Sequence, residues 1–294
     1  MPSILPQLII NGLIAGSIYA LAASGFSLVY YVIKFMNFAQ GAIITISAYM
    51  FFLFFSMLRM NFIISSVLAI LTSIAIMMLM NILVYKPLRK RKSTKVVTMI
   101  SSLALLILFS SLILAIFGSG TKTIHLENFN KTYDFGAFTI TAIQSIIIIS
   151  ATTLFLLLFI MVKNTRLGKS MRALADNKEV SQVVGINPEK VYIFTFIIAA
   201  VFGSIAGILI GMEQNLYPRM GVPIIVKGFI SSVVGGISSV PGAVIGGLLV
   251  GLAENLGIWF LPSGYKDAVS FTILLLFLLF KPNGILGVKM RDDT

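Results

Sequence analysis

Residues 62–85, FIISSVLAILTSIAIMMLMNILVY, are followed directly by residues 86–95, KPLRKRKSTK. The first run is long and apolar enough to cross a membrane as a helix, which takes about 20 residues. The second run is basic and holds no acid. Because loops rich in Lys and Arg stay in the cytoplasm, this pair of segments predicts a membrane span that ends on the cytoplasmic side.

The rest of the chain has the same character. Of the 294 residues, 58% are hydrophobic and 11% charged, and the mean hydropathy of +1.01 excludes a soluble protein. The apolar stretches lie at residues 7–33, 41–58, 62–85, 96–117, 138–162, 191–212, 224–260 and 266–280. We therefore predict an all-α polytopic membrane protein with about eight hydrophobic segments, forming a single domain over residues 1–294. Gly235-Gly236 and Pro241-Gly242 interrupt residues 224–260, which form either two short helices or a re-entrant pair.

A second basic loop at residues 163–190 allows the topology to be predicted. Two apolar stretches separate it from the first basic loop, so both loops lie on one side. Residues 118–137, which include His125 and Glu127, are nearly balanced in charge and belong outside. Counting spans places the N-terminus outside, whereas Lys281, Lys289 and Arg291 predict a cytoplasmic C-terminus.

Composition also excludes several functions. The chain has no Cys and one His, so disulfides, thiolate catalysis and the usual metal sites are excluded, and an enzyme is not expected. The net charge of +12 is concentrated in the two loops rather than spread along a nucleic-acid-binding surface. Gly168-Lys169-Ser170 resembles the end of a phosphate-binding loop but lacks the earlier Gly and the preceding strand, so no nucleotide or metal cofactor is expected on this chain.

The loop at residues 163–190 has the pattern of short helices. Asp176 and Glu179 are spaced as in a capping box, which predicts a helix start near Asn177. Val180, Val183 and Val184 give this helix an apolar face, and Gly185 and Pro188 end it after about two turns. Such a helix could lie on lipid headgroups or dock into a groove on a partner protein. Valines, in place of large anchoring side chains, favour the protein partner.

Polar residues within the apolar stretches are candidates for a transport pathway, because ionisable groups at membrane depth are costly. Glu254 could face the pathway or an interior helix junction, or it could reach water at a helix end. Asn37 and Gln40 could be turn residues or part of a broken-helix site, and Asn11 is a weaker candidate of the same kind. We expect no basic partner for these groups within the membrane, which disfavours a proton or sodium relay.

Several motifs together resemble the branched-chain amino-acid permeases of LivH type, which belong to ATP-binding cassette (ABC) importers. They are Asn11-Gly12, Gly16-Ser17-Ile18-Tyr19-Ala20-Leu21, Asn37-Phe38-Ala39-Gln40-Gly41, Arg172-Ala173-Leu174-Ala175-Asp176-Asn177, Gly185-Ile186-Asn187, Gly235-Gly236-Ile237, Tyr265-Lys266-Asp267 and Lys281-Pro282-Asn283-Gly284. The sequence departs from the family at Gln40, where His is common, and at Ser181, where Ala is usual.

The resemblance implies a type II-like importer permease in a bacterial inner membrane that carries branched-chain or related neutral amino acids by alternating access. Its partners would be a second homologous permease, two ATPase subunits that use ATP and Mg, an extracytoplasmic solute-binding protein and membrane lipid. The implied ATPase-coupling residues are Arg172, Ala173, Leu174, Ala175, Asp176, Asn177, Val180, Val183, Val184, Gly185 and Ile186. The alternative is a self-contained secondary transporter or channel, which would not need a docking helix in this loop.

Overall fold

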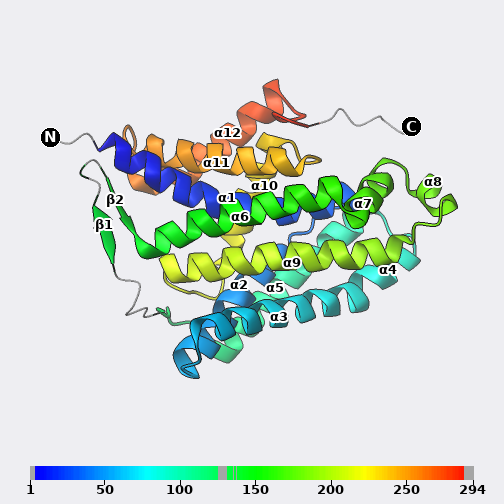
Figure 1. Cartoon of the computed structure of the whole chain (residues 1–294), viewed down its shortest axis with the longest axis horizontal. Coiled ribbons are helices and arrows are strands. Elements are labelled where there is room, and N and C mark those ends of the chain that lie inside the picture. The colour runs from blue at the N-terminus through cyan, green and yellow to red at the C-terminus, as the bar shows by residue number, and fades with distance from the viewer. Residues whose placement is uncertain (1–3, 125–130, 135, 137, 288–294) are drawn as a thin grey trace.

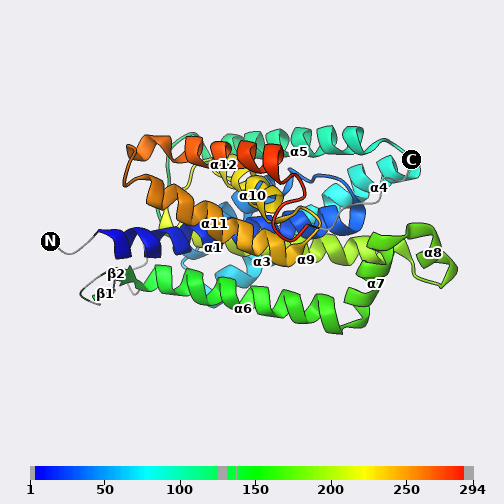
Figure 2. The same cartoon turned by 90° about the horizontal axis from the view of Figure 1, so that it is seen from above.

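A computed structural model describes residues 4–124, 131–134, 136 and 138–287. Its helices run roughly along the long axis of the molecule (Figures 1 and 2). One end carries the start of α1 and a β-hairpin, and we call it the hairpin end. The other end carries α4, α7 and α8, which contain the two basic loops, and we call it the basic end (Figure 1). Both basic loops therefore lie on one side of the bundle, as the sequence predicts.

Seven helices among the described residues are long and apolar enough to cross a membrane. Their bounds are α1 Leu5–Ile33, α2 Gln40–Phe52 with a π-helical extension Leu53–Met57, α3 Phe62–Met80, α5 Lys95–Phe117, α6 Ala142–Asn164, α9 Pro188–Glu213 and α11 Val240–Gly257. The shorter helices are α4 Lys86–Lys90, α7 Arg166–Asp176, α8 Lys178–Val183, α10 Gly221–Gly235 and α12 Lys266–Phe280, and a 3-10 turn covers Ser263–Tyr265. The predicted all-α class is confirmed.

Two predicted boundaries are wrong. The first basic loop is partly helical, because α3 continues through the π-helix Asn81–Tyr85 into α4. Residues 138–141 do not belong to α6. Thr141 and Gln144 form a capping box that starts the helix at Ala142, and Thr139–Thr141 instead form β2, which pairs antiparallel with β1, Thr132–Asp134.

The long stretch 224–260 forms two antiparallel helices, α10 and α11. The turn between them contains Gly236 at φ 110°, a conformation that favours glycine. A Cβ on Gly235 would lie 1.8 Å from the carbonyl oxygen of Gly242, so the two helices can approach only without side chains here. At 15 residues, α10 is about 22 Å long, shorter than the hydrocarbon layer of about 30 Å. Its first residue donates a backbone hydrogen bond to Thr45 Oγ1 of α2 at 3.0 Å, well inside the bundle.

Helix α1 forms the centre of the bundle and packs against α11, α9 and α10. Small residues make these contacts close. Gly247 and Gly251 of α11 lie against Ala20 and Gly16 of α1, while Gly207 lies against α2. These glycines and the alanine therefore serve close helix packing, which matters in a membrane because lipid provides little hydrophobic driving force for helix association.

Candidate functional site

The segment α7–α8 extends from the basic end as a pair of short, well-defined helices (Figure 1). Thr165 starts α7 by accepting a hydrogen bond from the N–H of Gly168 at 3.0 Å. A Cβ on Gly168 would lie 2.4 Å from the carbonyl oxygen of Met161, so this glycine permits the tight turn from α6 into α7. The Gly-Lys-Ser sequence at residues 168–170 thus has a structural explanation.

Asn177, rather than Asp176, caps α8. Its Oδ1 accepts hydrogen bonds from the N–H groups of Glu179 at 2.9 Å and Val180 at 3.0 Å. Asp176 is the last residue of α7. The predicted helix start was correct, but the capping residue was wrong because α7 continues one residue further than the motif suggested. Gly185, at φ 85°, ends the segment.

The predicted apolar face of α8 is exposed. Val180, Val183 and Val184 expose 58%, 87% and 69% of their surface, whereas Ser181 is buried on the opposite side. Asp176, Asn177 and Gly185 are also exposed. Three neighbouring valines on a capped helix form an apolar patch with no partner in the described chain, which is typical of a protein contact surface.

The remaining predicted coupling residues hold α7 against the bundle instead. Leu174 and Ala175 are buried, and Ala173 and Ile186 are half-buried. Arg172 Nη1 donates to the carbonyl oxygens of Val162 and Lys163, which close the end of α6. Of the predicted coupling residues, those on α8 therefore form an exposed contact surface, and those on α7 attach this surface to the bundle.

Charged contacts tie the basic end together. Arg89 Nε and Nη2 donate to both carboxylate oxygens of Glu189, at 3.2 and 3.0 Å, and the guanidinium lies 5.1 Å from the Tyr192 ring centre. These contacts join α4 to α9.

Lys34, at the end of α1, has a lowered pKa, mainly because it is partly buried. The nearby charge of Lys95 lowers this pKa further, and the charge of Asp176 opposes the shift.

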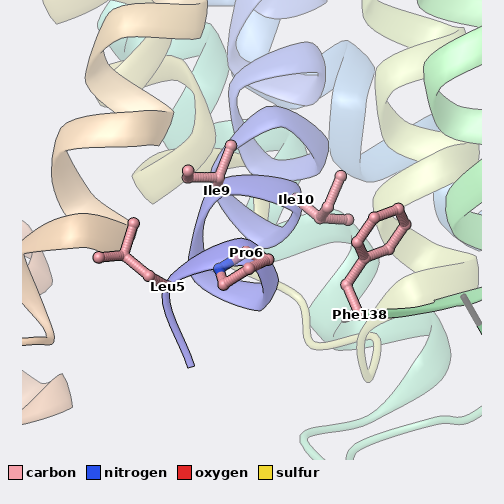
Figure 3. A pocket seen from close by; sticks show the side chains of 5 residues that line it. All are labelled: Leu5, Pro6, Ile9, Ile10 and Phe138. Carbon is pink, nitrogen blue, oxygen red and sulfur yellow. The ribbon is translucent and has the colours of Figure 1, made fainter. Parts of the chain in front are cut away.

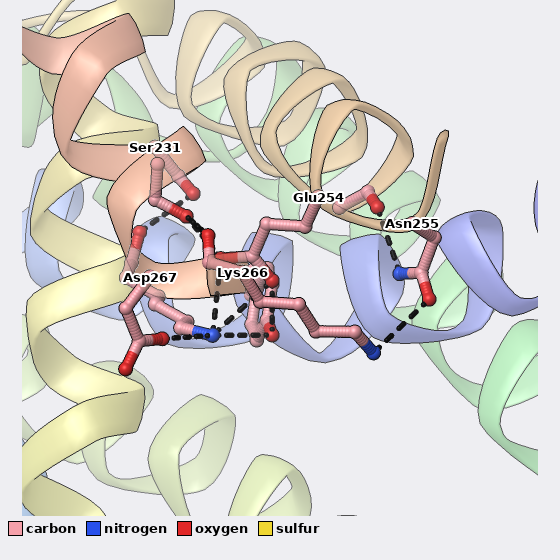
Figure 4. Close-up of polar contacts among 9 residues, drawn as sticks. Ser231, Glu254, Asn255, Lys266 and Asp267 are labelled. Carbon is pink, nitrogen blue, oxygen red and sulfur yellow. Dashed lines mark hydrogen bonds and ion pairs between the residues drawn. The ribbon is translucent and has the colours of Figure 1, made fainter. Parts of the chain in front are cut away.

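Glu254 lies in a buried ionic cluster, which we call the Lys227 cluster, between α1, α10, α11 and α12 (Figure 4). Lys227 Nζ lies 3.0 and 3.1 Å from the two carboxylate oxygens of Glu254 and 3.0 Å from Asp267 Oδ1. Tyr19 Oη donates to Glu254 at 2.8 Å, and Ser270 Oγ also donates to this carboxylate.

The prediction that Glu254 has no basic partner in the membrane is wrong, because the fold brings Lys227 of α10 against it. Lys227 is the one basic residue between residues 224 and 260, and Glu254 is the one acid. A single charge of each sign in an otherwise apolar stretch was the signal that could have found this pair.

The three amide candidates lie elsewhere in the bundle. Asn37, in the non-helical link between α1 and α2, and Gln40, the first residue of α2, are both fully buried. Asn37 accepts a hydrogen bond from Tyr85 at 2.8 Å, and Gln40 donates to the carbonyl oxygen of Ala199 in α9. This link is irregular backbone enclosed by protein, as the membrane requires. Asn11 is half-buried at the hairpin end and accepts from Gln7 at 3.1 Å.

Two hollows lie on the surface of the described chain. The first, of about 420 Å³, is an apolar depression at the hairpin end lined by Leu5, Pro6, Ile9, Ile10 and Phe138 (Figure 3). The second, of about 210 Å³, lies between α10 and α12 and adjoins the Lys227 cluster. It is lined by Val222, Pro223, Val226, Lys227, Ile230, Asp267, Ser270 and Phe271. Only the second combines charged groups with an apolar wall.

These features define a multi-pass α-helical membrane protein with a structured extension at one end. The chain belongs to the family described as branched-chain amino acid transport system permease component, whose model matches residues 8–278.

Individual relatives agree with this assignment. The chain is 34% identical to the high-affinity branched-chain amino acid transport system permease protein LivH of Salmonella typhimurium, covering 96% of this chain and 95% of the relative. It is 33% identical to the corresponding protein BraD of Pseudomonas aeruginosa, with the same coverage. A structure of PsaBC from Streptococcus pneumoniae in complex with Fab matches with a TM-score of 0.53 and 14% identity, covering 93% of this chain and 91% of that one. That likeness supports the fold alone.

The comparisons confirm the resemblance read from the sequence. The chain is a permease component, a translocation subunit rather than an enzyme, and a multi-pass inner-membrane protein. Family membership decides against the alternative of a self-contained secondary transporter or channel.

Proposed function

We propose that this chain forms part of the transmembrane pathway of an ATP-driven importer for branched-chain or related neutral amino acids. The chain would bind no cofactor, and ATP and Mg would be used by separate ATPase subunits. Motion of those subunits would be converted into alternating access of the pathway. The family and its named relatives support this role.

The exposed valine face of α8 is the observation that carries the coupling part of this proposal. An ATPase subunit that binds this face would exert force through α7, whose buried residues Met171 and Leu174 pack into the bundle. Helix α7 in turn contacts α1, α6 and α9. Because a nucleotide shifts an equilibrium only through its differential affinity for two states, ATP must favour one arrangement of these helices.

The complete assembly would contain a second homologous permease, two ATPase subunits and an extracytoplasmic solute-binding protein. Large apolar side chains are exposed along α3, α5 and α6, which suits contact with lipid. Asp267, by contrast, exposes 69% of its side chain next to Lys227. A charged face of this kind favours a partner permease or an aqueous pathway over lipid. No nucleic acid is expected to bind.

The coupling surface is tested by the double substitution Val183→Asp and Val184→Asp. Binding of an ATPase subunit would bury two carboxylates in an apolar contact, and removing them from water costs free energy. Recovery of the ATPase subunits in a pull-down from membranes should therefore fall at least tenfold. Membrane insertion should be unchanged, because both side chains are exposed. Val96→Asp is the matched control, since Val96 is exposed at the start of α5 near the same end. Normal ATPase recovery and transport in the double variant would contradict the proposal.

The proposed orientation has the basic end in the cytoplasm and the hairpin end outside. In the naturally Cys-free chain, Lys90→Cys and Lys178→Cys should react with an impermeant maleimide only from the cytoplasmic side. Tyr133→Cys, on the exposed hairpin, should react only from outside. Glu127, Lys289 and Arg291, which contribute to the sequence-based topology, lie outside the described residues. Labelling from the opposite sides would reverse the orientation.

A further inference from the structure

The second hollow and the Lys227 cluster together have the chemistry of a ligand site. We propose that this hollow, bounded by α10 and α12, binds the transported amino acid itself, as a free zwitterion with a branched apolar side chain. This inference rests on the proposed function and adds a location and a recognition chemistry to it.

The charged end of the hollow matches the backbone groups of an amino acid. Lys227 Nζ can donate three hydrogen bonds, and in the structure its partners are Tyr19 at 3.1 Å, Glu254 at 3.0 Å and Asp267 at 3.0 Å. Tyr19 and Glu254 are buried and fix the ammonium in place. Asp267 is largely exposed, so its contact with Lys227 is weak and can be exchanged.

A zwitterionic amino acid could bind both Lys227 and Asp267 once these two residues separate. Its carboxylate would take the place of Asp267 on Lys227, while its ammonium would bind the released Asp267 carboxylate. Glu254 and Asp267 both contact the one ammonium of Lys227, while Lys266 binds Asn255, so Asp267 released from Lys227 would be free to pair with the ligand ammonium. Ser270, which also lines the hollow, is buried and donates its hydroxyl to Glu254, so it holds that carboxylate beside Lys227.

The apolar end of the hollow matches a branched aliphatic side chain. It is lined by Val222, Pro223, Val226, Ile230 and Phe271. The hollow measures about 210 Å³, so it has room for a small branched aliphatic side chain beside these residues.

The position of the hollow fits a pathway. α10 is the short helix that starts inside the bundle against Thr45 of α2, so the hollow is formed by a helix that does not span the membrane. Transport proteins commonly place substrate sites at such interrupted helices. By comparison, the larger hollow at the hairpin end is lined by apolar residues and offers no charged side chain for a zwitterion.

Equilibrium binding of radiolabelled L-leucine to the purified permease–ATPase assembly, without solute-binding protein, tests the site. Asp267→Asn should weaken leucine binding at least tenfold, because a charge-assisted contact to the ammonium is lost. Val226→Phe should abolish binding by filling the hollow. N-acetyl-leucine, which lacks the ammonium, should not compete. Asp134→Asn, on the exposed hairpin, and Val67→Phe, on the exposed face of α3, are the matched controls and should bind leucine normally.

A change in selectivity provides a readout that a purely structural role would not give. Val226→Ala enlarges the hollow, so the ratio of phenylalanine to leucine binding should rise by roughly tenfold. Wild-type leucine affinity in Asp267→Asn and Val226→Phe, or a wild-type assembly that imports leucine without binding it here, would overturn the inference and leave the proposed function standing. Absence of ATP-dependent leucine uptake by the wild-type assembly with its binding protein would instead count against the proposed function.

Discussion

Replacing Lys227 by Met should destabilise the folded protein by about 3–5 kcal/mol, because removing one partner of a buried ion pair leaves the other charge uncompensated. Glu254 exposes only 1% of its side chain, and its remaining partners, Tyr19 and Ser270, are neutral hydroxyls. The measurement is reversible unfolding in mixed detergent micelles, with the yield of monodisperse protein as a second readout.

Two further variants separate charge from packing. The double variant Lys227→Met with Glu254→Gln should recover most of the loss, since neither charge is then buried alone. Asp267→Asn should cost less than about 1 kcal/mol, because this carboxylate is exposed and its ion pair is solvated. Lys190→Met, at an exposed position in the first turn of α9, is the matched control. If Lys227→Met were as stable as Lys190→Met, the cluster would not be a buried ion pair.

The sequence was sufficient for those features that depend on local composition. Apolar runs of membrane length become helices because no other regular structure satisfies the backbone in lipid. The exposed face of α8 was also predictable, since Val180, Val183 and Val184 lie between a capping residue and a helix-ending glycine. In each case the signal and its consequence lie within a few residues of one another.

Features that depend on tertiary packing could not be predicted. Leu174 and Ala175 lie in the same motif as Asn177, yet they are buried against the bundle, because the turn at Gly168 fixes which face of α7 points inward. Gln40 lies in a motif that suggested a pathway, but its side chain fills the space between Gly25 of α1 and Gly203 of α9. Residue types alone do not distinguish these buried positions from exposed ones.

Gly251→Leu should prevent stable packing of α11 on α1, with a loss of at least about 3 kcal/mol. Overpacking a well-packed contact usually costs 1–3 kcal/mol, and here a Cβ would lie 2.3 Å from backbone atoms of Gly16, which cannot rotate away. The thermal midpoint and the yield of monodisperse protein measure the effect. Gly120→Leu is the control, because a Cβ at Gly120 has no atom within 4 Å. A thermal midpoint for Gly251→Leu equal to that of the control would contradict the close contact.

The milder Gly251→Ala connects this contact to the proposed ligand site. Glu254 lies three residues after Gly251, and Tyr19 lies three residues after Gly16, so in each helix the two positions are on the same face. The close contact between the glycines therefore brings Tyr19 Oη to 2.8 Å from Glu254, which in turn holds Lys227. Separating α1 and α11 by a methyl group should lengthen this hydrogen bond and release the lysine. Gly251→Ala brings the same Cβ against Gly16, so it should also cost stability, although less than the leucine variant. In the fraction that assembles with the ATPase, we expect L-leucine to bind several-fold more weakly. Unchanged leucine binding in an assembled Gly251→Ala variant would show that the glycine contact supports the fold without positioning Lys227.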